Sequence, residues 1–477
     1  MILLKKLEKN RNFWFLVFVT FFFFLLRLPS LFEPLWYGDE GIYQAIGISL
    51  NDGKLLYKDS FDNKPPLLYW LYAFLNSDQY LVRFASLIFG VLSIITFFFL
   101  SKKIFKDKKN ISYLTTSVFA ILFGLPLLEG NIANAENFML LPVIVSAFFI
   151  VGQKKLFISG LILGIAFLFK IVAIFDFAAF FTFLLFVYFD LIKTRINKLK
   201  KLALGFFIPT ALVSLFFLAN GTIMNFLNAA LVANIPYVSY GNRVGEFPYL
   251  LFFKLALVGI FVFYLFTKRK TVSNAALFVA LWIVFSLFNA FFSQRPYTHY
   301  LLVLLPSFSL ILGLILFEKK YQRIVLLSAI AILVIVATAF KVTNFKKNIS
   351  YYQNFVSYMT GAKSTRDYQA FFDKNTPIDY EIALFIKPRL NKGETIFVWG
   401  NNAQLYNLVN AVPPSKYVVA YHITNYKDGA ESTQKAIEKT KPRFVVIMPN
   451  QKAIPFPLIN YSRKININNV AIYEKLF

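Results

Sequence analysis

The chain has no cysteine and only two histidines, His299 and His422, in its 477 residues. A disulfide framework and a thiolate metal site are therefore excluded, and a multi-histidine metal centre is not expected. Acidic residues are also scarce, because 24 Asp and Glu stand against 50 Lys and Arg, for a formal net charge of +26. In a soluble protein this surplus would suggest nucleic-acid binding, so the distribution of the basic residues decides its meaning.

Motifs that bind nucleotides are absent as well. The one Gly-Lys pair, Gly53-Lys54, is followed by Leu55 and not by the Ser or Thr of a phosphate-binding loop. No glycine-rich fingerprint opens the helices that we expect in the C-terminal part. The sequence therefore predicts no ATP or nucleotide-sugar site.

Apolar sequence, by contrast, is abundant. Hydrophobic residues make up 58% of the chain, Phe alone occurs 59 times, and the mean hydropathy is +0.59. Apolar runs of roughly 14 to 20 residues recur from end to end, which is typical of a polytopic α-helical membrane protein. We expect about eleven membrane helices, near residues 13–29, 80–100, 112–129, 137–151, 156–169, 172–189, 202–219, 250–267, 275–292, 300–317 and 324–341.

Basic residues cluster at the N-terminus and in every second loop between these helices. The clusters are Lys5, Lys6, Lys9 and Arg11; Lys102, Lys103, Lys106, Lys108 and Lys109; Lys154 and Lys155; Lys193, Arg195, Lys198, Lys200 and Lys201; Lys268, Arg269 and Lys270; and Lys319, Lys320 and Arg323. The alternate loops hold far fewer, among them Lys54, Lys58, Lys64, Arg243 and Arg295. The positive-inside rule then predicts a cytoplasmic N-terminus in the cytoplasmic membrane, with a retained first helix, and it attributes most of the net charge to topology and not to nucleic acid.

The composition changes after Phe340, so we divide the chain into a membrane module, residues 1–341 with its first external loop at 30–79, and a polar domain, residues 342–477. An odd number of membrane helices places this domain outside the cytoplasm. Its apolar runs at 395–399, 416–421 and 443–448 alternate with helix-like stretches at 403–410 and 430–440. This alternation predicts a small α/β domain with a parallel sheet.

The first external loop opens with an acidic pair, Asp39-Glu40, followed one helical turn later by Tyr43. One interpretation is a helix start, with Asp39 as the N-cap and Glu40 in the first turn. The other is a reactive carboxylate with a sugar-binding neighbour, since charges at a membrane interface usually bind or react.

The same loop closes with Asn63-Lys64-Pro65-Pro66, in which the prolines hold the lysine extended. A fixed cation at the interface suits a lipid phosphate, and a snorkelling lysine is the alternative. Arg83, at the outer end of the next helix, has the same two interpretations.

Polar clusters mark three further external turns. Glu136 and Asn137 suit sugar hydroxyls or an ordinary solvated turn, and Arg295, Tyr297 and His299 suit an anion and sugar site or a plain hairpin turn. At a third turn, Lys170 and Asp176 are expected to form an ion pair or to contact the headgroup of a ligand.

These motifs, in order, resemble those of GT-C glycosyltransferases. The resemblance is carried by DE after the first helix, NKPPLLYW in the first loop, ANAENFMLLP at the fourth helix, RPYTHYLLVLLP at the tenth and IFVWGNNAQLYNLVNAVPPSKYVVAY in the C-terminal domain. It is strongest to bacterial relatives of the dolichyl-phosphate-mannose protein mannosyltransferases, which include the aminoarabinose transferases that modify lipid A.

The resemblance implies transfer of a sugar from a polyprenyl-phosphate carrier to a hydroxyl of a protein, lipid or glycan acceptor, with inversion, at the outer face of the membrane. It makes Asp39 the essential acid and Lys64 and Arg295 the phosphate ligands. Relatives that bind a metal have Glu where this chain has Asn63, so we predict no cofactor and leave a divalent ion as an alternative.

Two other function classes compete with this one. A transporter or lipid flippase would commonly show internal repeats and charges near the bilayer midplane, whereas here no repeat is visible and the charges gather at one face. A scaffold that only presents the external domain would leave the acidic pair and the Asn-Lys-Pro-Pro motif without a role.

Overall fold

The computed structural model describes residues 10–106, 108–242, 249–342 and 346–476. The basic residues Lys5, Lys6, Lys9 and Arg243, which served the topology prediction, lie outside these ranges. The chain divides into two compact units. The first unit comprises Met1–Leu28, Ala85–Phe216 and Val232–Ile349, and the second comprises Pro29–Phe84, Phe217–Leu231 and Ser350–Phe477.

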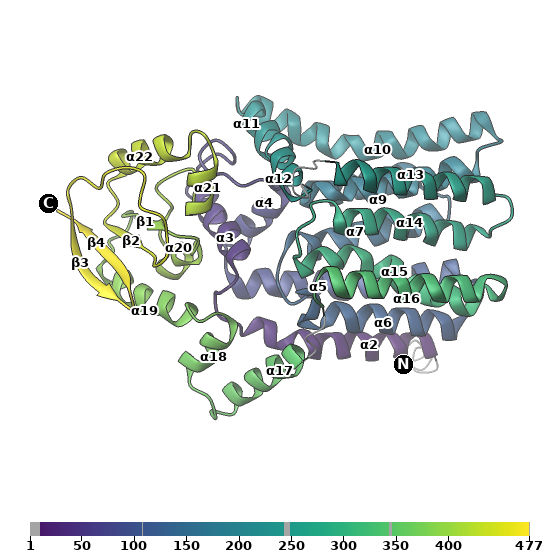
Figure 1. The fold of residues 1–477 in the computed structure, drawn as a ribbon, viewed down its shortest axis with the longest axis horizontal. Helices are drawn as coiled ribbons and strands as arrows, with labels where there is room; N and C mark the ends of the chain where they lie inside the picture. The colour runs from purple at the N-terminus through teal and green to yellow at the C-terminus, as the bar shows by residue number, and fades with distance from the viewer. Residues whose placement is uncertain (1–9, 107, 243–248, 343–345, 477) are drawn as a thin grey trace, which may run out of the picture. The chain divides into compact units, whose positions relative to one another are not determined.

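The first unit is helical, and Figure 1 shows most of its long helices running alongside one another. Its elements are α2 (Arg11–Arg27), most of α5 (Gln79–Ile104), α6 (Lys109–Gly124), α7 (Ala135–Val151), α8 (Leu156–Phe169), η3 (Ile171–Ala173), α9 (Ile174–Val187), most of α10 (Ile192–Ala219), α12 (Asn234–Gly241), α13 (Leu250–Lys268), α14 (Asn274–Phe291), η5 (Thr298–Leu304), α15 (Leu305–Phe317) and α16 (Gln322–Ala339). A helix lies at each predicted membrane segment.

Seven helical segments in the described residues are long and apolar enough to cross a membrane, namely those that contain α2, α5, α10, α13, α14, α15 and α16. The apolar helices α7, α8 and α9 are shorter. The prediction of a polytopic helical membrane protein is thus confirmed, while the number eleven stays a prediction.

Small residues allow two of these helices to approach closely. A Cβ atom on Gly160 would lie 2.2 Å from the carbonyl oxygen of Leu202, and one on Gly205 would lie 2.2 Å from that of Phe157. The backbones of α8 and α10 therefore touch, as helices in lipid do where small residues face each other. Elsewhere aromatic rings fill the space between helices; the rings of Phe97 and Phe119, for example, stack 4.6 Å apart.

The second unit holds a four-stranded sheet in the order β1-β2-β4-β3. The strands are β1 (Ile396–Trp399), β2 (Phe444–Ile447), β3 (Tyr461–Ile467) and β4 (Val470–Lys475). Strands β1 and β2 are parallel, whereas β4 pairs antiparallel with both β2 and β3. The sheet is therefore mixed, and the prediction of a parallel sheet was right only for its first pair.

The helices of this unit are α3 (Gly38–Asn51), α4 (Pro66–Phe74), α11 (Ile223–Leu227), most of α17 (Lys346–Met359), α18 (Thr365–Phe372), α19 (Thr376–Ile386), α20 (Gln404–Val409), α21 (Ala420–Asn425) and α22 (Gly429–Thr440). The predicted strand at 416–421 was wrong. Lys416 accepts a backbone hydrogen bond from Phe61 and Ala420 donates one to Gly400, so the segment pairs with loops and then enters α21. The β3–β4 hairpin was missed because β3 is mostly exposed and polar.

The first external loop and the C-terminal residues share one hydrophobic core. Ala45 of α3 belongs to the same buried cluster as Leu405 of α20 and Val398 of β1. A Cβ atom on Gly41 would lie 2.7 Å from the backbone nitrogen of Gln404, so the glycine permits α3 to reach α20. The α/β residues thus support the helix whose first turn carries the acidic pair. The division at residues 341 and 342 stays a prediction.

Candidate functional site

Asp39 lies in the first turn of α3, behind the N-cap residue Tyr37. It is therefore not the N-cap that one interpretation of the sequence suggested. Its side chain is 39% exposed, and its Oδ2 atom accepts a hydrogen bond of 3.1 Å from the hydroxyl of Tyr43, one turn later. A carboxylate in this position is both held by the protein and open to another molecule.

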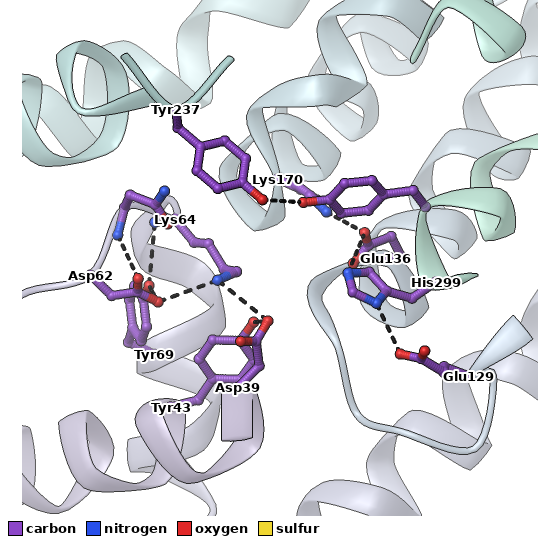
Figure 2. Close-up of polar contacts among 12 residues, drawn as sticks. Asp39, Tyr43, Asp62, Lys64, Tyr69, Glu129, Glu136, Lys170, Tyr237 and His299 are labelled. Carbon is purple, nitrogen blue, oxygen red and sulfur yellow. Dashed lines mark hydrogen bonds and ion pairs between the residues drawn. The ribbon is translucent and has the colours of Figure 1, made fainter. Parts of the chain in front are cut away.

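Lys64 faces this carboxylate. Its Nζ atom is 3.8 Å from Oδ2 of Asp39 and 4.9 Å from the centre of the Tyr43 ring, as Figure 2 shows for the ion pair. Pro65 is the N-cap of α4 and Pro66 is its first residue, so the backbone beyond the lysine is fixed. The sequence analysis predicted that Asp39 and Lys64 act in the same site, and within the second unit their side chains lie close together.

Asp62 is a residue that the sequence reasoning missed. It is 3% exposed, its Oδ2 atom lies 3.4 Å from Nζ of Lys64, and the same oxygen accepts a bond of 2.7 Å from the hydroxyl of Tyr69. Burial and the nearby Asp62 raise the pKa of Tyr69 well above its usual value, so the phenol stays a donor. The only signal in the sequence was a carboxylate two residues before the lysine, which fits an exposed loop equally well.

Arg83 and Glu40 form a buried ion pair. Nε of Arg83 donates to Oε1 of Glu40 at 3.1 Å, and Nη1 lies 2.9 Å from Oε2 of Glu33. Glu33 in turn accepts a hydrogen bond of 2.6 Å from the hydroxyl of Tyr351 in α17. The Arg83 side chain is 0% exposed. This network fastens α3, α5 and α17, which favours a structural role for Arg83 and Glu40.

A second group of charges lies in the first unit. His299 places Nδ1 2.9 Å from Oε2 of Glu129 and Nε2 3.9 Å from Oε1 of Glu136, and Lys170 pairs with Glu136 (Figure 2). The ammonium of Lys170 also lies 4.5 Å from the centre of the Tyr300 ring. The sequence singled out Glu136 and His299 separately. Glu129 was missed because it stands in an irregular turn with no motif around it.

The suggested ion pair of Lys170 with Asp176 is not what the structure shows. Lys170 contacts Glu136, and Asp176 accepts a hydrogen bond of 2.8 Å from the indole of Trp282. The two residues stand at the start of neighbouring helical segments, η3 and α9, yet their partners come from other helices.

The remaining predicted residues have different surroundings. The guanidinium of Arg295 lies 5.0 Å from the ring centres of both Tyr237 and Tyr240. Tyr297 is 48% exposed, and its ring stacks on that of His299 with the ring centres 5.6 Å apart. Asn137 is fully buried and donates 2.7 Å to the carbonyl of Gly130, so it serves helix packing.

Metal ligands do not come together in the parts of the chain that the structure describes. No three His, Asp or Glu side chains are grouped there so as to hold an ion. Asn63 follows Asp62 and donates its backbone N–H to that carboxylate at 2.8 Å. The absence of a metal stays a prediction, and no step below is routed through one.

A comparison with protein families finds one match. The model of the family described as dolichyl-phosphate-mannose-protein mannosyltransferase matches residues 63–217. No curated protein matches the chain in sequence.

Solved structures match over most of the chain. ArnT from Cupriavidus metallidurans bound to undecaprenyl phosphate aligns with a TM-score of 0.56 and 15% identity, over 97% of this chain and 98% of that one. Its apo state gives a TM-score of 0.57 at 15% identity, with the same coverage of 97% and 98%. The apo oligosaccharyltransferase of Archaeoglobus fulgidus gives 0.52 at 12% identity, over 92% of this chain and 70% of that one. The resemblance found in the sequence is thereby confirmed at the level of the fold.

Proposed function

We propose that this chain, which has the GT-C fold of membrane glycosyltransferases, moves a sugar from a polyprenyl-phosphate-linked donor to a hydroxyl group of an acceptor. The observation that carries the proposal is the pairing of Asp39 with Lys64 at 3.8 Å. It sets a partly exposed carboxylate beside a cation that is held in place. The donor class is supported by the undecaprenyl phosphate in the structurally similar ArnT.

Asp39 would act as the general base. It takes the proton of the acceptor hydroxyl while the acceptor oxygen bonds to the anomeric carbon of the sugar, and the bond from that carbon to the phosphate oxygen breaks. The configuration at the anomeric carbon is inverted, and the polyprenyl phosphate is the leaving group. A positioned base of this kind contributes about 10²–10⁴-fold to the rate. Asp62 and Glu40 are buried beside it, so Asp39 is the carboxylate of this cluster that an acceptor can reach.

Lys64 would neutralise the phosphate as it leaves, which is usually the largest electrostatic contribution in such a reaction. The Lys64 ammonium lies 3.4 Å from Oδ2 of Asp62 on one side and 4.9 Å from the centre of the Tyr43 ring on another. The lysine is thus oriented before the donor arrives, and the enzyme does not spend binding energy on ordering it.

Arg295 and His299 are proposed as further ligands of the donor phosphate, and Glu136 and Tyr297 as contacts for sugar or acceptor hydroxyls. The buried Nε atom of Arg295 has no hydrogen-bond partner among the described residues, which supports a role in holding a ligand. The setting is the outer face of the cytoplasmic membrane, with a cytoplasmic N-terminus and an extracytoplasmic C-terminal domain. The alternation of basic loops supports this orientation.

The test is an assay of purified protein with a polyprenyl-phosphate sugar, without ATP and without an ion gradient. We expect the wild type to transfer or hydrolyse the sugar, and Asp39→Asn to lose at least about 100-fold in kcat while still binding the lipid. Asp52→Asn is the matched control, because Asp52 is exposed directly after the other end of α3. Near-normal transfer by Asp39→Asn would remove the base from the mechanism. Movement of the lipid across a vesicle membrane without cleavage would favour a flippase instead.

A further inference from the structure

His422, one of the chain's two histidines, lies beside the Asp62 carboxylate. It belongs to α21 of the C-terminal domain, and its Nε2 atom is 3.8 Å from Oδ1 of Asp62. The imidazole ring packs edge-on against Phe61 at 5.5 Å and lies 5.9 Å from Tyr426. The His422 side chain is buried among these aromatic rings, a position that apolar side chains fill more often than histidine.

The segment before α21 is held against the first external loop by two hydrogen bonds. Phe61, which precedes Asp62, donates its N–H to the carbonyl of Lys416 at 2.9 Å. Lys54, earlier in the same loop, donates to the carbonyl of Pro413. Two contacts on the segment before α21 therefore hold that segment against the loop that contains Asp62 and Lys64.

The proton of His422 can be assigned from its surroundings. The Nδ1 atom is buried and has no hydrogen-bond partner among the residues that the structure describes. Because a buried N–H without an acceptor is rarer than an unpaired acceptor, the neutral tautomer with its proton on Nε2 is favoured. That proton faces Asp62. Burial lowers the pKa of His422 more than Asp62 and Asp39 raise it, which agrees with a neutral ring.

Asp62 is therefore shared between His422 and Lys64. Its Oδ1 atom faces the imidazole and accepts the N–H of Asn63, while its Oδ2 atom faces the ammonium and accepts the hydroxyl of Tyr69. Burying a carboxylate is costly unless its oxygen atoms accept hydrogen bonds or face a partner. The imidazole lies on the Oδ1 side at 3.8 Å, which is beyond hydrogen-bond distance, so it acts on the carboxylate through the dipole of its N–H group.

We infer that His422 is a positioning residue: it orients the Asp62 carboxylate and, through it, the Lys64 ammonium that binds the donor phosphate. The inference rests on the lipid-phosphate binding of the proposed function. It makes the C-terminal domain part of the donor site, because that domain supplies a group on which the binding cation depends.

The experiment compares two substitutions in the full-length protein. His422→Phe keeps an aromatic ring against Phe61 and Tyr426 but removes both nitrogens. His422→Gln removes the ring but restores an N–H near the position of Nε2. Binding of undecaprenyl phosphate to each purified variant in detergent is measured near neutral pH and below its unfolding temperature. Tyr406→Phe is the control, because it removes a buried hydroxyl that accepts from the Val398 N–H within the same domain.

A positioning role predicts that His422→Phe raises the Kd about tenfold, the scale on which supporting partners act in other charged sites. His422→Gln should stay within about threefold of the wild type, since it keeps the donor. Tyr406→Phe should lower the unfolding temperature and leave the Kd unchanged. A packing role predicts the reverse order, with Phe tolerated better than Gln.

The inference is overturned if His422→Phe binds like the wild type, if His422→Gln binds more weakly than His422→Phe, or if the wild type does not bind undecaprenyl phosphate. The proposed reaction is judged separately, by sugar transfer in the wild type. A wild type that binds the lipid in a His422-dependent way but transfers no sugar would keep this inference and reject the transferase.

Discussion

Arg83 meets Glu40 side-on inside the second unit, with Nε 3.1 Å from Oε1 and Nη2 2.5 Å from Oε2. Neither side chain is more than 4% exposed. Two parallel hydrogen bonds of this kind hold a carboxylate in one orientation. The pair fixes the start of α3, and with it the position of the neighbouring Asp39.

Breaking this pair should destabilise the fold more than it changes the chemistry. Glu40→Gln leaves a buried guanidinium with one carboxylate fewer, which costs about 3–5 kcal/mol. The unfolding temperature in detergent should therefore fall clearly. Glu431→Gln, which breaks the exposed pair with Lys435 on α22, should leave it almost unchanged. If Glu40→Gln kept its stability and lost only transfer, Glu40 would belong to the binding site instead.

Removing the cation of the Asn-Lys-Pro-Pro motif should weaken lipid binding. Lys64→Gln loses a charge-assisted contact with the phosphate, so the Kd for undecaprenyl phosphate should rise about 10- to 100-fold. Lys58→Gln is a suitable control, because Lys58 lies exposed in the same loop. Equal affinities for the two variants would mean that Lys64 only anchors the loop at the membrane.

Tyr43 offers a way to separate the base from the cation. Tyr43→Phe removes the hydroxyl that donates to Asp39 but keeps the ring below Lys64. We expect kcat to fall about two- to tenfold with little change in the donor KM. Tyr43→Leu also removes the ring, so the donor KM should rise as well. Identical kinetics for the two variants would contradict this division of roles.

Asp379 should make the stability of the second unit depend on pH. Burial raises the pKa of Asp379 to about 7, although it accepts hydrogen bonds from Asn402 and Gln404. The folded state therefore keeps a proton that the unfolded chain releases above its ordinary pKa of 3.8. The stability due to this group is complete below that pKa and is lost as the pH rises to about 7, a change on the order of 4 kcal/mol.

Thermal unfolding between about pH 5 and 8 tests this expectation. The unfolding temperature should fall as the pH rises toward 7, and Asp379→Asn should flatten the curve. Asp52→Asn is the control, because Asp52 is an exposed aspartate of the same unit. A curve for Asp379→Asn that kept the full slope would assign the pH dependence to other groups.

Contacts within one loop were the part of the site that could be predicted. Asp39 and Lys64 belong to one short external loop, and the prolines after the lysine restrict its backbone locally. Arg83 was predicted as a phosphate ligand because an arginine at a helix end has the same local sequence whether or not the fold gives it a carboxylate partner. Its partner Glu40 stands 43 residues earlier, and no local pattern connects them. Glu136 and Lys170 are likewise 34 residues apart.

The sequence by itself determined the membrane class, the alternation of basic loops and the placement of Asp39 and Lys64 in one short loop. These follow from the length of apolar runs and from backbone restrictions, which act between near neighbours. Only the tertiary structure decided that Asp62 lies beside Lys64 and that Arg83 is paired with Glu40 and Glu33. It also decided that His422 of the C-terminal domain lies beside the Asp62 carboxylate. Burying a charge is unfavourable unless the fold brings it a partner, and that partner is chosen by packing, whatever its distance along the chain.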